Sequence, residues 1–163
     1  RRACILAACT LAAGLTACSS YSPPAQVVGQ TVQQVQQAMG PATGRYTLPD
    51  GSTRLEFARG PFGRHTWMLD LGPDGRVKAS EQVLTDNMFA TLREGDSRES
   101  VLQRIGQPSE VRGGGRQGGE VWSWLYDDRN NCLWFEVSMI DARVVHPSYG
   151  IDPRCNAGGN DRS

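Results

Sequence analysis

Apolar side chains follow a helical spacing and then a strand spacing along much of the chain, and this order occurs twice. In the first copy Val32, Val35 and Met39 are separated by three or four residues, which predicts a short amphipathic helix. The second copy repeats that spacing with Val101 and Ile105. We expect the apolar face of each helix to lie in the core.

The two copies align as an internal repeat. Residues 29–41 (GQTVQQVQQAMGP) match residues 95–108 (GDSRESVLQRIGQP), with one extra residue before the second proline. From this proline on, equivalent positions are 67 residues apart. The larger apolar residues then pair as Leu55 with Trp122, Phe57 with Trp124, and Trp67 with Trp134. Two copies of one supersecondary unit explain this match better than chance does.

Both helices carry start and stop signals. Thr31 and Gln34 have the spacing of a capping box, and Asp96 and Glu99 stand in a similar relation in the second copy. Each helix is predicted to end at a glycine, because a proline follows within two residues. Residues 85–92 carry apolar side chains at helical spacing as well, so a preceding helical turn is expected there.

After each proline the apolar pattern changes to alternation, which predicts strands separated by glycine-rich and polar turns. Three strands are predicted in each copy, over residues 54–59, 65–71 and 76–84, and over residues 120–126, 131–138 and 143–146. The fold class is therefore predicted to be α+β, with two tandem ααβββ units, residues 27–84 and 85–155, whose helices pack on one face of antiparallel sheet.

The N-terminal residues read as a targeting segment. Residues 3–17 are small, apolar and uncharged behind two arginines, too few to span a bilayer but typical of a secretory signal. Residues 15–18 (LTAC) resemble the lipobox of bacterial lipoproteins, which implies cleavage after residue 17 and a covalent lipid on Cys18. Ser19 implies sorting to the periplasmic face of the outer membrane. The alternative is an uncleaved apolar tail with a coincidental cysteine.

Residues 18–26 are then a lipidated tether and residues 156–163 a flexible tail. The chain has 17 basic and 17 acidic side chains, and a balance of this kind argues against a nucleic-acid partner.

With Cys18 lipidated, the mature chain keeps Cys132 and Cys155, which are predicted to form a disulfide in an oxidising compartment. Two free thiols, or half of a metal site, are the alternative.

The repeated Gly-x-Thr/Ser-x-x-x-Val-x-x-x-x-Gly-x-Pro pattern, in a chain with a lipobox, resembles the SmpA/OmlA (BamE-like) family of outer-membrane lipoproteins. The resemblance implies an ααβββ unit that, doubled, is similar to the β-lactamase inhibitor protein fold. It also implies a protein-binding accessory of β-barrel protein assembly or envelope integrity. A periplasmic module that occludes an enzyme, and a purely structural lipoprotein, are the alternatives.

Motifs for catalysis are weak. Residues 113–118 match G-x-G-x-x-G, but they precede a Trp-rich strand, the reverse of the order that dinucleotide binding requires, so a loop is predicted. Asp127 and Asp128 are adjacent and are predicted to lie in a solvated turn. No catalytic residue, metal site or cofactor apart from the lipid is expected, so the protein is not expected to be an enzyme.

Binding residues are predicted in two places. Phe62, between Arg59 and Arg64 in a glycine-containing loop, is a candidate contact with an acidic protein surface or with phospholipid head groups. Trp122 and Trp124 lie on one face of a strand and are candidate partner-binding residues. The alternatives are an ordinary connecting loop and core packing.

Overall fold

The computed structural model describes residues 22–59, 63–114, 118–127 and 132–156. The predicted signal peptide (1–17), Cys18, most of the predicted tether, Phe62 and residues 157–163 lie outside the described residues. Among the helices that are described, none has the length and apolar character needed to cross a membrane.

The described chain is α+β, as predicted, with two four-stranded antiparallel sheets. The first sheet has the strand order β1 (Gly44–Thr47), β2 (Thr53–Arg59), β3 (His65–Leu71), β4 (Val77–Gln82), and the second has the order β5 (Glu110–Gly113), β6 (Glu120–Leu125), β7 (Leu133–Ile140), β8 (Arg143–Ile151). The helices are α1 (Val32–Met39), α2 (Asp86–Phe89), α3 (Arg98–Ile105) and α4 (Pro153–Asn156).

Four strands in each sheet correct the prediction of three. The additional strands, β1 and β5, are short edge strands with the sequences GRYT and EVRG. Neither carries the alternation of apolar and polar residues that marks a half-buried strand, because neither buries an apolar side chain. Pairing with β2 and β6 therefore forms them, and their own sequence pattern does not reveal them.

The helices form where local chemistry predicts. The Thr31 hydroxyl accepts from the Gln34 backbone N–H and the Gln34 side chain accepts from the Thr31 backbone N–H, which confirms the capping box of α1. The N-cap of α3 is Ser97, which corrects the predicted Asp96. The Asp96 carboxylate instead accepts from Arg104 Nη1 at 2.8 Å, so it ties the start of α3 to its last turn.

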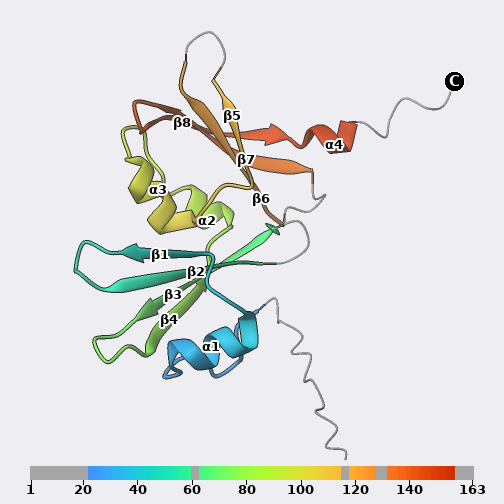
Figure 1. Ribbon diagram of the computed structural model, residues 1–163. Coiled ribbons are helices and arrows are strands. Elements are labelled where there is room, and N and C mark those ends of the chain that lie inside the picture. Colours follow the sequence, from blue (N-terminus) through green and yellow to red (C-terminus); the bar gives the residue numbers. More distant parts are fainter. Residues whose placement is uncertain (1–21, 60–62, 115–117, 128–131, 157–163) are drawn as a thin grey trace, which may run out of the picture.

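The structure is layered, and Figure 1 shows α1, the first sheet, the pair α2 and α3, and the second sheet in succession. One core lies between α1 and the first sheet, and it includes Val35, Met39, Leu55, Phe57 and Leu69. A second core lies between α2, α3 and the second sheet, and it includes Phe89, Val101, Ile105, Trp122, Trp124, Tyr126 and Phe135. The apolar faces predicted for α1 and α3 are thus confirmed as core.

The register of β7 corrects one pair in the predicted repeat. Trp67 pairs with Phe57 in the first sheet, whereas in the second sheet Trp124 pairs with Phe135. Phe135 is therefore the counterpart of Trp67, and Trp134 points to the opposite face of the sheet. The cause is one extra residue between the paired positions, since nine residues separate Phe57 from Trp67 and ten separate Trp124 from Phe135. The side chains of β7 therefore face opposite to the predicted alignment.

The end of α3 joins the two sheets. Arg54, Glu56 and Thr66 lie on the face of the first sheet that points away from α1, and α3 ends against this face at Gly106. Glu56 Oε1 accepts from the backbone N–H of Gln107 at 3.2 Å. Arg54 Nη1 donates to the carbonyl of Gln103 at 2.9 Å. The second half of the chain thus covers a sheet face of the first half.

Candidate functional site

The two predicted loop arginines are engaged within the protein. Arg59 donates to the carbonyl of Met39 through Nε at 2.9 Å and through Nη2 at 2.6 Å, and Nη2 also reaches the carbonyl of Pro41 at 2.9 Å. Arg59 is therefore a cap for the C-terminal end of α1, where carbonyls lack partners within the helix. Its predicted contact with a partner stays a prediction.

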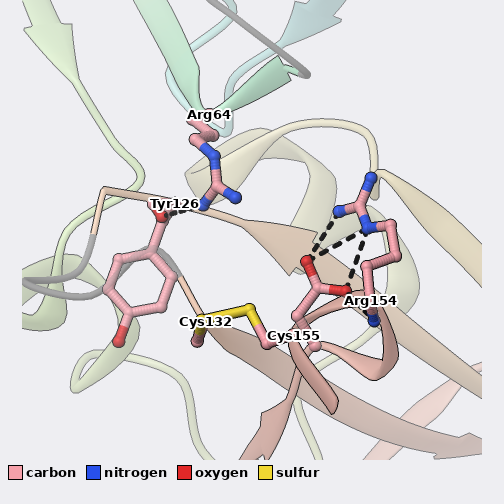
Figure 2. The surroundings of a disulfide bond; sticks show 6 residues. Arg64, Tyr126, Cys132, Arg154 and Cys155 are labelled. Carbon is pink, nitrogen blue, oxygen red and sulfur yellow. Dashed lines mark hydrogen bonds and ion pairs between the residues drawn. A yellow bond between two sulfur atoms is a disulfide. The ribbon is translucent and has the colours of Figure 1, made fainter. Parts of the chain in front are cut away.

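Arg64 has a similar structural role at the junction of the two sheets. Its Nη1 donates to the backbone carbonyl of Tyr126 at 2.8 Å, and Figure 2 shows the side chain crossing from β3 toward the end of β6. The neighbouring His65 Nε2 lies 2.5 Å from Asp127 Oδ2, so two consecutive residues bind the second sheet. The predicted partner contact of Arg64 stays a prediction.

Trp122 and Trp124 belong to the core and not to a contact surface. The side chains are 4% and 0% exposed, respectively. Trp124 Nε1 donates to the carbonyl of Gly106 at 3.1 Å, so the indole also caps the end of α3. Their common face is as predicted, but it points toward α2 and α3, which corrects the proposed partner-binding role.

The predicted disulfide between Cys132 and Cys155 is present, with the two Cα atoms 5.8 Å apart. It joins the residue before β7 to α4, and Figure 2 shows it below Arg64 and beside Arg154. The bond holds α4 at one end of the second sheet. Residues from the C-terminal part of the chain thereby reach the outer face of this sheet, the face that points away from α2 and α3.

A pocket of about 330 Å³ lies at this place. It is lined by Ser109, Glu110, Leu125, Trp134, Asp152, Pro153 and Arg154. Leu125 and Trp134 are a cross-strand pair on the outer face and supply its apolar floor. Glu110 and Arg154 supply charge at its exposed rim. An apolar floor with a few polar groups around it is the usual composition of a binding pocket.

The acidic group of the pocket is held ionised. The Asp152 carboxylate is buried, at 2% exposure, and accepts from Arg154 Nη2 at 2.7 Å and from Arg154 Nε at 2.9 Å. These hydrogen bonds are the main reason that the pKa of Asp152 is lowered, and they outweigh the burial that would raise it. Asp152 in turn fixes the orientation of the Arg154 guanidinium, whose side chain is 56% exposed.

Trp134 is the least expected member of the pocket. Its ring lies near two guanidinium groups, with Arg112 at 5.6 Å and Arg154 at 5.8 Å from the ring centroid. The side chain is 4% exposed, and its Nε1 makes no hydrogen bond within the described part of the chain. The indole is near enough to Asp152 to help lower the pKa of that carboxyl, but it does not reach hydrogen-bonding geometry.

The sequence missed this site because the pocket depends on the extra residue before β7. The predicted alignment placed Trp134 with Trp67, whose side chain packs against the core beside α1. Counting the β6–β7 connection as one residue longer would have moved Trp134 to the outer face. Only the predicted disulfide of Cys155 indicates that Asp152 and Arg154 lie near Trp134.

No protein-family model and no curated protein matches the chain. Within the part of the chain that the structure describes, no group of three or more His, Cys, Asp or Glu side chains is placed to hold a metal ion. The function is therefore argued from the pocket and from the sequence.

Proposed function

We propose that the chain is a lipoprotein anchored in the outer membrane through Cys18, and that its folded part is a protein-binding module without catalytic activity. One observation carries this proposal: the pocket at Leu125 and Trp134 lies on the same kind of sheet face that already binds a protein segment in the first sheet. There Thr66 and Glu56 receive Gly106 at the end of α3. In the first sheet this face thus binds another segment of the same chain.

The finer architecture that we propose is two tandem ααβββ units, residues 27–84 and 85–155, of the SmpA/OmlA (BamE-like) kind. Two features support it: α1 and α3 are capped alike and end alike, at Gly40 and Gly106, each with a positive φ. In addition, each is followed by a four-stranded antiparallel meander. The edge strands β1 and β5 are then additions that both units share.

The envelope location has independent chemical support. Disulfides persist in oxidising compartments such as the bacterial periplasm, and Cys132 and Cys155 form one. A lipid on Cys18 would keep the module at a membrane surface, because several acyl chains anchor a protein stably. The partner that we propose belongs to the machinery of β-barrel protein assembly or envelope organisation.

The test begins with the anchor. Cells that produce the full chain are labelled with palmitate, and we expect the wild type to carry the label and to fractionate with the outer membrane. A Cys18→Ala variant should lose both properties. Persistent labelling of that variant would place the lipid elsewhere, and an unlabelled wild type would contradict the lipoprotein proposal.

The binding function is tested by crosslinking in intact envelopes, with the Cys18→Ala variant as the control that is released from the membrane. We expect a stoichiometric envelope partner with the wild type. Recovery of a soluble periplasmic enzyme that the purified protein inhibits stoichiometrically would reject the role in assembly. The protein would then be an enzyme inhibitor. Recovery of no partner would reject the binding module.

A further inference from the structure

We infer that the pocket on the outer face of the second sheet binds the carboxyl-terminal end of an α-helix of a partner protein. This inference rests on the proposed function, since it names the part of the partner that a protein-binding module would receive.

The end of α3 shows the chemistry of such a site. The last carbonyls of a helix have no partners within it, and they carry the negative end of the helix dipole. In α3 two of these carbonyls are bound by a guanidinium and an indole: Arg54 donates to Gln103, and Trp124 donates to Gly106. Arg54 is held in place by the carboxylate of Asp70, at 2.6 and 2.9 Å.

The pocket contains the same set of donors. Arg154 is a guanidinium held by a carboxylate, that of Asp152, as Arg54 is held by Asp70. Trp134 supplies a buried indole N–H that makes no hydrogen bond to the described residues. A buried donor without a partner is unfavourable, so a carbonyl that reaches it is favoured. The apolar floor accepts the side chain that accompanies the last helical turn.

The position of the pocket agrees with this chemistry. In the first sheet the aromatic pair Phe57 and Trp67 is followed by the pair Ala58 and Thr66. In the second sheet the aromatic pair Trp124 and Phe135 is followed in the same way by the pair Leu125 and Trp134. In the first sheet the residue at this place, Thr66, is in contact with the helix end: a Cβ added to Gly106 would lie 3.0 Å from the Thr66 Cγ2 atom. The pocket is thus the counterpart of a surface that receives a helix end.

A second copy of this chain does not fit as the occupant. Of the two eight-residue helices, α3 ends against the first sheet, so α1 is the one whose end such a copy would offer. Its carbonyls at Met39 and Pro41 already accept from Arg59. In the repeat, Pro41 occupies the position of Gln107, whose backbone N–H donates to the Glu56 carboxylate. A proline has no N–H and cannot make this hydrogen bond. The partner is therefore a different protein that presents an uncapped helix end.

The test places a benzophenone amino acid at either of two exposed positions in the full-length protein and irradiates intact envelopes. Glu110 lies at the rim of the pocket, and Gln36 lies on α1 at the opposite end of the layered structure. We expect crosslinks from the Glu110 position, and we expect mass spectrometry to map them to the last turn of a helix in the partner.

The donor is tested by Trp134→Phe, which keeps an aromatic ring and removes the N–H. The crosslink yield from the Glu110 position should fall about three- to tenfold, the loss expected for one hydrogen bond. Trp67→Phe, a matched change of a partly buried indole on the first sheet, should leave the yield unchanged. Equal losses in both variants would show a folding effect and overturn the role of the Trp134 N–H.

The remaining outcomes separate the two proposals. Crosslinks from the Gln36 position alone would support the proposed binding module but reject the pocket as its binding site. Crosslinks from the Glu110 position to a strand or loop of the partner would reject the helix end. No crosslink from either position would reject both proposals.

Discussion

Glu56 and Gln107 connect the first sheet to the end of α3 through a partly buried hydrogen bond, in which the Glu56 carboxylate accepts from the Gln107 backbone N–H at 3.2 Å. Glu56 is 0% exposed, and its second carboxylate oxygen accepts from the Tyr46 hydroxyl. A buried carboxylate is tolerated where hydrogen bonds replace its hydration. Glu56 thus has a structural role at the junction between the first sheet and the end of α3.

The first prediction follows from this pair. Glu56→Ala removes the acceptor of the partly buried Tyr46 hydroxyl and Gln107 N–H, so we expect it to lower the free energy of unfolding by about 2 kcal/mol, measured by urea denaturation. Glu56→Gln keeps one acceptor oxygen and should cost about 1 kcal/mol. Ala at the exposed Glu94 is the control, with an expected change within about 0.5 kcal/mol. Equal losses for the two Glu56 variants would contradict the hydrogen-bonding role.

A glycine beside Glu56 gives the second prediction. Gly106 has a φ of +78°, and a Cβ added to it would lie 2.9 Å from the Glu56 Cδ atom. Gly75 has a similar φ of +74° but open space around it. Gly75→Ala should therefore cost about 1 kcal/mol from backbone strain alone. Gly106→Ala should cost about 2 kcal/mol more, because the sheet junction must also move.

Urea denaturation of the two alanine variants measures this difference directly. If Gly106→Ala costs no more than Gly75→Ala, the end of α3 does not pack as tightly against Glu56 as the structure indicates. A Glu56→Gln, Gly106→Ala double variant then shows whether the two positions are coupled, since adjacent sites depart from additivity.

Helix ends and core faces were predictable from the sequence because they depend on neighbours in the chain. The capping box at Thr31 and the apolar stripe of α1 are local patterns, and the structure confirms both. Edge strand β1 was not predictable, because it forms through pairing with β2 and not through an apolar pattern of its own. A strand without a buried apolar residue leaves no periodic signal to find.

The site was less predictable than the fold. A glycine-rich loop with arginines is a sound place to expect binding, but Arg59 and Arg64 find carbonyls of Met39 and Tyr126 that no sequence pattern identifies. The face of the sheet on which Trp134 lies depends on one extra residue before β7. Because successive side chains of a strand point to opposite faces, an error of one residue in the alignment assigns a side chain to the wrong face. The disulfide was predictable because counting cysteines is independent of register.

The disulfide gives the third prediction. Closing a loop with a sequence separation of 23 stabilises the folded state by roughly 3 kcal/mol in the chain-entropy description. A Cys132→Ser, Cys155→Ser variant should lose about that much in urea denaturation and should release α4 from the pocket. The emission of Trp134 should then shift to the red, measured as the difference from the same variant carrying Trp134→Phe.

Thiol counting is the control for this measurement. Denatured wild-type protein without reductant should bind no alkylating reagent at Cys132 or Cys155, and mass spectrometry of the alkylated protein locates any label. Labelling at both cysteines would show that the disulfide is absent. An unchanged free energy of unfolding in the double variant would show that α4 is held by Asp152 and Arg154 without it.

The fourth prediction concerns acid. The hydrogen bonds from Arg154 hold the pKa of Asp152 below its unfolded value of about 3.9. A lowered folded pKa stabilises the protein above the unfolded pKa, and this contribution is lost as the pH falls through the folded pKa. The advantage in unfolding free energy of the wild type over Asp152→Asn should therefore be constant from pH 7 to about pH 5 and shrink as the pH falls below about 4. Urea denaturation of both proteins between pH 7 and pH 2 measures it, with Glu94→Gln as an exposed control that should show no such trend. An advantage that stays constant down to pH 2 would mean that Asp152 does not depend on Arg154 for its charge, and the guanidinium would then lack the fixed orientation that a helix end requires.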